Sequence, residues 1–291
     1  MELNDLLQRQ NISPEEVIVL RHRPFEPKLN RVFPWLAADR HDLFNAYQQT
    51  HGERVERAMA SASYIASFIG HRPGEALFIG LYLIGTTRSL TPEEYWDIPA
   101  HKELKGLGME GFTEYDSRTS ILLFDLALQN FYSQWKGKLV IGWPPPERSW
   151  WRRAHRNQMP VRAILPESAL DAEMPEWYEI SFTWEQLRVL PNRWRIVLCQ
   201  WRAVYYIFDE SDCKGYVGSA YGADNLCLRW ENYGISGHGG NALLKKRNPH
   251  NFLFTILQRV SPDMSIEDVI HRESSWKDRL HTRAPLGLNE N

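Results

Sequence analysis

Glu273 is a carboxylate on a helix face that should otherwise contact a core. A helical pattern covers residues 265–280, and it opens with Ser265 and Asp268 in capping-box positions. The predicted apolar stripe of this helix consists of Ile266, Val269, Ile270, Trp276 and Leu280. Glu273 lies on this stripe, about two turns after Ile266. A carboxylate that faces a core is costly unless a cation or a metal pairs it, so Glu273 is either a partnered structural residue or a metal ligand.

Arg229 interrupts an earlier helix, predicted over residues 224–233, in a similar way. The inner face of that helix is marked by Leu226, Trp230 and Tyr233, and Arg229 lies beside Trp230. A lone arginine at such a position is more often a surface residue whose head reaches solvent. A guanidinium and a carboxylate aimed at one small sheet instead indicate a site for a phosphate and a metal.

Two tyrosines, Tyr205 and Tyr216, lie eleven positions apart on a predicted hairpin. Residues 203–208 form its first strand, a polar loop follows, and Tyr216 begins the second strand. Simple packing would explain one such pair of rings. A third strand is predicted over residues 252–260, so the C-terminal part is expected to be a small three-stranded antiparallel sheet flanked by helices.

This combination resembles the GIY-YIG nucleases. Ala203-Val204-Tyr205 looks like the GIY element, although alanine stands where glycine is usual, and Tyr216-Val217-Gly218 looks like the YIG element. Arg229, Glu273 and Asn289 follow in the order of the family, with a somewhat longer spacing from Tyr216 to Arg229. Asn291 competes with Asn289 for the terminal position. The resemblance covers the last third of the chain.

The resemblance implies a role for each matching residue. Glu273 would be the single protein ligand of a divalent ion, Mg²⁺ or Mn²⁺, with waters completing the shell. Tyr205 would act as general base or position the attacking water, and this role needs nearby positive charge because a free phenol has a pKa of about 10. Arg229 would stabilise charge on the phosphate. Tyr216 would order the water or the phosphate, and Asn289 would support the site by hydrogen bonding.

A glycine-rich loop over residues 234–241 precedes a basic segment of Lys245, Lys246 and Arg247. The loop follows a helix and lacks the GK[ST] ending, which excludes a P-loop. In a nuclease the three cations would hold the DNA backbone and His238 would assist proton transfer. The alternative is a solvated basic turn. The His271-Arg272-Glu273 triplet also matches the start of a zinc-deaminase motif, but the required Pro-Cys-x-x-Cys is missing.

Residues 1–195 resemble no family that we can name, and we expect them to form a larger, mixed, β-rich α+β domain before a nuclease domain over residues 196–291. The fold class of the chain is thus α+β. Two tryptophans, Trp150 and Trp151, are interleaved with cations that would grip phosphates: Arg148, Arg152, Arg153 and Arg156. A scaffold whose tryptophans are simply buried is the alternative.

Composition limits the function classes. The net charge is −2, so any contact with nucleic acid must come from local basic patches. The three cysteines include no CxxC pair and indicate free thiols in a reducing compartment. The first residues do not form a signal peptide, and the longest apolar run, residues 76–84, is too short to cross a bilayer. We therefore expect a cytoplasmic protein that does not span a membrane.

The leading hypothesis is a metal-dependent endonuclease that cuts DNA, most simply double-stranded DNA, while the N-terminal region chooses the target. RNA is not excluded as a substrate. Restriction or defence against foreign DNA suits this layout, and repair or mobile-element cleavage are other roles for it. The alternative class is a noncatalytic nucleic-acid-binding or regulatory protein that keeps the fold. The sequence does not predict an oligomeric state.

Overall fold

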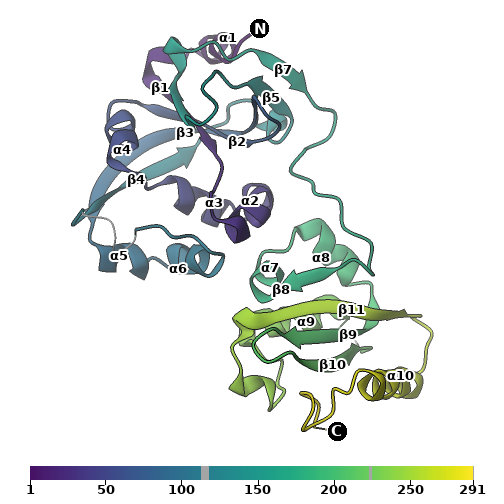
Figure 1. Cartoon of the computed structure of the whole chain (residues 1–291). Helices are drawn as coiled ribbons and strands as arrows, with labels where there is room; N and C mark the ends of the chain where they lie inside the picture. The colour runs from purple at the N-terminus through teal and green to yellow at the C-terminus, as the bar shows by residue number, and fades with distance from the viewer. Residues whose placement is uncertain (113–117, 223–224, 291) are drawn as a thin grey trace. The chain divides into compact units, whose positions relative to one another are not determined.

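The computed structural model describes residues 1–112, 118–222 and 225–290. The chain divides into two compact units, Met1–Ala172 and Glu173–Asn291 (Figure 1). The sequence pattern places residues 173–195 in the first domain, but in the structure they belong to the second unit. The physical reason is that β8 (Ser181–Thr183) pairs with a strand of the C-terminal sheet and the helix after it packs there as well.

The N-terminal unit is built on a seven-stranded mixed sheet in the order β6-β1-β2-β3-β5-β7, with β4 also paired to β3. Its strands are β1 (Val17–His22), β2 (Tyr64–Gly70), β3 (Glu75–Leu90), β4 (Ile121–Leu128), β5 (Leu139–Gly142), β6 (Trp151–Arg153) and β7 (Val161–Ile164). Only β1 and β2 pair in parallel within the described residues. A parallel pair needs a long crossover, and three helices occupy it.

The helices of this unit are α1 (Leu3–Arg9), α2 (Pro27–Asp39), α3 (His41–Gln48), α4 (Glu53–Met59), α5 (Pro92–Asp97) and α6 (Pro99–Gly106). Successive residues of β1 enter separate clusters: Val17 and Val19 join one core, whereas Ile18 and Leu20 join another. The sheet is therefore covered on both faces, as expected for a strand that is buried along its whole length.

The expected mixed α+β character of this region is confirmed, with local differences. Residues 42–67 have a mostly helical pattern in the sequence, but this expectation is wrong at its end, because β2 already begins at Tyr64. The short apolar run over residues 120–132 fits a strand or a helix, and the structure has the strand β4 there. None of the helices in the described part of the chain is long and apolar enough to cross a bilayer.

The C-terminal unit has a four-stranded antiparallel sheet in the order β10-β9-β11-β8 (Figure 1). Its longer strands are β9 (Arg202–Asp209), β10 (Lys214–Ala220) and β11 (Phe252–Val260). These are the three strands that the sequence predicts. The expected number of three is wrong because the short β8 adds a fourth strand beside β11.

In the described part of this unit four α-helices accompany the sheet: α7 (Trp184–Arg188), α8 (Asn192–Leu198), α9 (Leu226–Ser236) and α10 (Ile266–Arg279). Ser265 caps α10 by accepting a hydrogen bond from the backbone N–H of Asp268. Residue 224, at the start of the predicted helix, lies outside the described residues.

The buried face of α10 differs from the predicted apolar stripe. Ile266 and Ile270 are 49% and 48% exposed, whereas Val269 is fully buried and Lys277 is only 7% exposed. The inward row is thus Val269, Glu273 and Lys277, at successive spacings of four residues. Glu273 faces inward as predicted, but its neighbours on that face are not those expected.

Candidate active site

Tyr205 lies in the central strand β9 directly opposite Gly218 on the edge strand β10. A Cβ atom at residue 218 would lie 2.5 Å from the Tyr205 hydroxyl oxygen and 2.9 Å from Cε1 of Tyr216. Only glycine leaves room for the Tyr205 ring to cross this position. The predicted hairpin therefore brings both tyrosines to one place, with ring centroids 6.5 Å apart.

Arg229 on α9 reaches this ring. Its Nε donates to the Tyr205 hydroxyl at 3.1 Å, and the Tyr205 and Tyr233 hydroxyls lie 3.2 Å apart. Tyr233 follows Arg229 by one helical turn, and the guanidinium carbon lies 5.6 Å from the centre of its ring. Among the described residues, Arg229 forms hydrogen bonds only through Nε. Its terminal nitrogens are therefore available to a ligand.

Burial controls the ionisation of this cluster. Tyr205 is fully buried, and burial raises the pKa of its phenol, with Tyr216 adding to the shift and Arg229 opposing it. Arg229 supplies the positive charge that a tyrosine base needs, but desolvation raises the pKa of Tyr205 by more than this charge lowers it. Tyr205 is neutral near pH 7 and serves as a hydrogen-bonding group. Tyr205 also raises the pKa of Arg229, which keeps the guanidinium charged.

Glu273 is held beside the edge strand β10. Ser219 Oγ donates to its Oε2, and Lys277 Nζ lies 2.7 Å from its Oε1. Ser219 follows Gly218, so its side chain leaves the other side of the strand from Tyr205. Glu273 and Arg229 thus approach β10 from its two sides. Among the described residues, the carboxylate forms no hydrogen bond with Tyr205, Tyr216 or Arg229.

The donor set at Glu273 fits a hard divalent cation. Its carboxylate and the Ser219 hydroxyl are oxygen donors, and Mg²⁺ binds in proteins through one or two carboxylates while keeping several waters. No group of three or more His, Cys, Asp or Glu residues that could hold a metal occurs in the described residues. Lys277 occupies one carboxylate oxygen, so a metal would have to share or displace this ammonium group.

Asn289 fastens the closing segment of the chain to β10. Its Oδ1 accepts from Val217 N at 2.9 Å, and its Nδ2 donates to Val217 O at 2.8 Å. Both groups of this side-chain amide are therefore used to hold the backbone between Tyr216 and Gly218. Asn289 is 2% exposed. Asn291, the competing candidate, lies outside the described residues.

His238 lies in the loop after α9. Its Nδ1 accepts from the backbone N–H of Gly240 at 2.9 Å. The neighbouring Gly239 packs on Tyr233, because a Cβ there would lie 2.6 Å from the ring of Tyr233. The loop thus covers the ring that contacts Tyr205, while a catalytic role for His238 stays a prediction.

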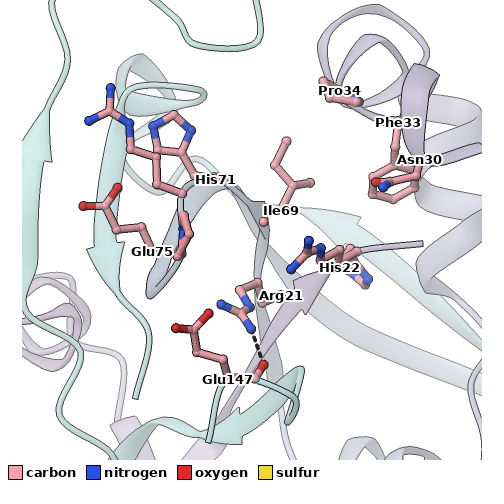
Figure 2. Close-up of a pocket in the computed structure, with 13 residues that line it drawn as sticks. Arg21, His22, Asn30, Phe33, Pro34, Ile69, His71, Glu75 and Glu147 are labelled. Atoms are coloured by element: carbon pink, nitrogen blue, oxygen red, sulfur yellow. Dashed lines mark hydrogen bonds between the residues drawn. The ribbon is translucent and has the colours of Figure 1, made fainter. Parts of the chain in front are cut away.

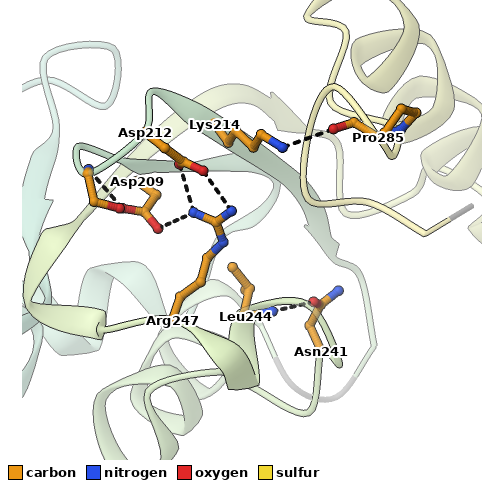
Figure 3. A network of polar contacts seen from close by, with 8 residues as sticks. Asp209, Asp212, Lys214, Asn241, Leu244, Arg247 and Pro285 are labelled. Carbon is orange, nitrogen blue, oxygen red and sulfur yellow. Dashed lines mark hydrogen bonds and ion pairs between the residues drawn. The ribbon is translucent and has the colours of Figure 1, made fainter.

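The basic segment after this loop divides into two parts. Lys245 and Lys246 are exposed and stay candidates for contact with a nucleic-acid backbone. Arg247 instead contacts Asp209 at 2.7 Å and binds both carboxylate oxygens of Asp212 (Figure 3). These acids border the β9–β10 hairpin loop, so Arg247 fixes the hairpin in this structure.

The N-terminal arginines also differ in their surroundings. Arg152 donates to the backbone carbonyls of Pro144 and Pro146, and Arg153 donates to Ser61 Oγ, so both fasten segments of this unit. Arg148 and Arg156 are exposed. Contact of these two residues with phosphate stays a prediction.

Sequence reasoning missed three side chains of the site. Tyr233 was assigned to packing only, and neither Ser219 nor Lys277 was singled out. Tyr233 and Lys277 each follow a selected residue, Arg229 or Glu273, by four positions on a helix. That spacing places side chains side by side and was the available signal for both.

Comparisons with known proteins give few matches. No protein-family model and no curated protein matches this chain. Two solved structures of the catalytic domain of I-TevI, an intron or homing endonuclease, are similar to it. One, of a mutant, has 21% identity over 32% of this chain and 95% of its own, with a TM-score of 0.26. The other has 21% identity over 31% of this chain and 98% of its own, also with a TM-score of 0.26.

Proposed function

We propose that the C-terminal unit is an endonuclease that hydrolyses DNA phosphodiester bonds with Mg²⁺ or Mn²⁺, and that double-stranded DNA is its substrate. The observation that carries this proposal is the fixed guanidinium of Arg229. Tyr205 holds Nε, which leaves the two terminal nitrogens as a fork that matches two phosphate oxygens. Restriction or defence against foreign DNA is the role that we propose for this activity.

Arg229 would stabilise the charge that develops on the phosphate during attack. Its side chain is already oriented, so little reorganisation is needed when the substrate binds. Tyr205 is a positioning residue in this scheme, because its buried neutral hydroxyl contacts Arg229 and Tyr233. Tyr216, which is 8% exposed, would orient the attacking water.

Glu273 and Ser219 would hold the divalent ion. The chemistry that the ion supplies is polarisation of the scissile phosphate and stabilisation of the leaving oxygen. In the structure Lys277 pairs with this carboxylate. Asn289 would keep Tyr216 and Gly218 in place through the backbone of Val217.

The test is cleavage of plasmid DNA by the full chain with and without Mg²⁺. Arg229→Ala should lower the cleavage rate by about 100-fold, as expected for loss of a group that stabilises transition-state charge. Glu273→Gln should abolish cleavage, whereas the matched change Glu267→Gln, an exposed carboxylate on the same helix, should leave the rate unchanged. Cleavage that survives Glu273→Gln at the original rate would contradict the site.

A noncatalytic nucleic-acid-binding protein is the second candidate. Two observations favour it: the Tyr205 hydroxyl is buried, and an ammonium group already neutralises Glu273. DNA binding that depends on Arg229, together with no cleavage of DNA or RNA at any Mg²⁺ or Mn²⁺ concentration, would support this candidate over the nuclease.

A further inference from the structure

The N-terminal unit contains a cavity of about 520 Å³ where β1 ends. Arg21 and His22, the last two residues of β1, line it. A second cavity of about 280 Å³ shares these two residues and also contacts Gly70 at the end of β2 (Figure 2). The carboxyl ends of parallel strands are where α/β sheets commonly bind ligands.

Flat side chains form much of the wall of the larger cavity. They are His22, Phe25, Tyr47, His51, Tyr95 and Trp150. The His22 and His51 rings are stacked with their centroids 6.2 Å apart, and the centroid of the Trp150 ring lies 5.3 Å from that of His51. Phe25 is 75% exposed, which is unusual for a phenylalanine that lines a cavity. Such walls suit a planar ligand that stacks against aromatic rings.

Unpaired polar atoms lie among these rings. Arg21 and Glu26 are 5% and 8% exposed, yet Arg21 Nε, Glu26 Oε2 and His51 Nε2 have no hydrogen-bond partner among the residues that the structure describes. Glu26 Oε1 accepts a hydrogen bond from Glu110 N at 3.0 Å. A buried polar atom without a partner is costly, so this set suits a ligand that carries donors and acceptors along one edge.

Cations border the cavity. Arg23 and Arg148 are exposed and line it. Arg21 and Glu147 line both cavities, and Arg21 donates to the backbone carbonyl of Glu147 (Figure 2). Exposed arginines beside an aromatic cavity suit a planar ligand that is attached to a phosphate.

We infer that this cavity binds one nucleobase extruded from a DNA strand, with the adjoining backbone phosphate against Arg23 and Arg148. The inference rests on the proposed function only in taking DNA as the polymer. Glu26 Oε2 would accept from the amino group or a ring N–H of the base, and the rings would stack on its faces. The volume exceeds that of a bare base, which leaves space for a substituent on it.

Binding of DNA duplexes, compared two at a time, tests this inference without cleavage. The protein is the full chain with Glu273→Gln. In each comparison one duplex has a single central mismatch, and the other is identical except that the mismatched base is replaced by an abasic position. Each natural base, 5-hydroxymethylcytosine and N6-methyladenine are placed at the mismatch. A mismatched base costs less to extrude, so at least one duplex should bind about tenfold more tightly than its abasic partner, the size expected for one stacked base.

Matched variants connect this preference to the cavity. Phe25→Ala and Glu26→Gln should each reduce the preference for the base over the abasic position several-fold. Trp135→Ala, which removes a half-buried tryptophan of the same unit outside the cavity, should leave it intact. Phe25 is exposed, so its replacement tests the cavity without risk to the fold.

Three results would overturn the inference: equal affinity for every base and the abasic duplex, a preference unchanged by both cavity variants, or equally tight binding of free nucleoside monophosphates. The last would indicate a site for a small nucleotide instead. Failure of the nuclease proposal is separate, because it would show as absent cleavage by the unmodified chain while the base preference persists.

Discussion

Gly218 shows how strictly one position controls the candidate active site. Because a Cβ there would overlap the Tyr205 hydroxyl, Gly218→Ala should displace that ring and with it Arg229. We expect a loss of about 1–3 kcal/mol of stability, as for other overpacked sites, and at least tenfold slower cleavage. Urea unfolding and plasmid cleavage measure the two effects.

Gly234→Ala is the matched control on α9. A Cβ there meets only Arg188 Cγ, at 3.7 Å. Alanine in a helix is favoured over glycine, so this change should stabilise the chain by about 0.5–1 kcal/mol and leave cleavage intact. Equal losses in both variants would contradict the special role of residue 218.

Lys277 gives a prediction about metal binding. Its ammonium group occupies Oε1 of Glu273, so Lys277→Gln should remove a competitor of the ion. The affinity for Mn²⁺, measured by calorimetry on the full chain, should rise several-fold. Lys246→Gln, at an exposed position, should not change it. Unchanged Mn²⁺ affinity in the Lys277 variant would place the ion away from this carboxylate.

His22 and His51 link stability to pH. Burial lowers the pKa of His22 from 6.5 to about 3 and that of His51 to about 4. Both are neutral in the folded state, whereas the unfolded chain takes up protons below pH 6.5, so stability is full above this value and falls with pH. At about pH 5, each histidine should lower the free energy of unfolding by about 2 kcal/mol relative to its value at neutral pH.

His51→Gln should remove about one of the protons that are taken up on unfolding between about pH 6.5 and pH 5. The free energy of unfolding of this variant should therefore fall less steeply as the pH is lowered. Urea unfolding of both proteins at about pH 7.5 and pH 5 provides the comparison, because the other titrating groups are shared. An identical loss of stability in the variant would show that His51 does not remain neutral in the folded state.

At the scale of elements, the chain segment around Asn289 stabilises the edge strand β10. Asn289→Ala leaves both backbone groups of Val217 without their side-chain partner, which should cost about 2–4 kcal/mol. Hydrogen exchange of the Val217 amide should accelerate more than that of β11 amides. Asn291→Ala serves as the control. Faster exchange in the Asn291 variant instead would reassign the terminal role.

Strong local patterns were enough to predict β9, β10, β11, α9 and α10. The buried face of α10 could not be predicted in the same way, because two rows of residues on this helix could each face the sheet. The sequence favours Ile266 and Ile270, but the helix turns the row through Val269 and Lys277 inward, where the lysine head meets Glu273. Which stripe is buried depends on the partner sheet, and helical periodicity alone does not contain that information.

The candidate active site also has features that local sequence patterns predict and features that they do not. The types and order of Tyr205, Arg229 and Glu273 were predictable from their motifs. The contacts between them were not: Arg229 and Tyr205 meet, whereas Glu273 meets Ser219 and Lys277. Hydrogen bonds across strands and helices depend on register, which single motifs do not specify.

At the scale of the whole molecule, the unit boundary makes a testable difference. Phe182 of β8 and Leu187 of α7 are buried in the C-terminal unit, and Trp184 Nε1 donates to Tyr233 O at 2.9 Å. A fragment of residues 173–291 should therefore unfold cooperatively. A fragment of residues 196–291 lacks these contacts and exposes the edge of β11, so it should melt at lower temperature and aggregate.

Circular dichroism and gel filtration of the two fragments make this comparison. Short strands such as β8 are hard to predict because three residues carry almost no periodicity, and this is why the sequence pattern puts the domain boundary too late, at residue 195. Equal melting temperatures of the two fragments would contradict the contribution of β8 and α7.

The ion pair of Glu273 and Lys277 has a consequence for when the proposed nuclease would act. A carboxylate that already has a counter-ion gains little by exchanging it for Mg²⁺, so a free protein would hold the metal weakly. A bound phosphate changes this balance, because it brings negative charge that attracts both the lysine and the metal. Such a protein would stay idle until DNA and metal arrive together, which suits an enzyme that shares its compartment with DNA it must not cut.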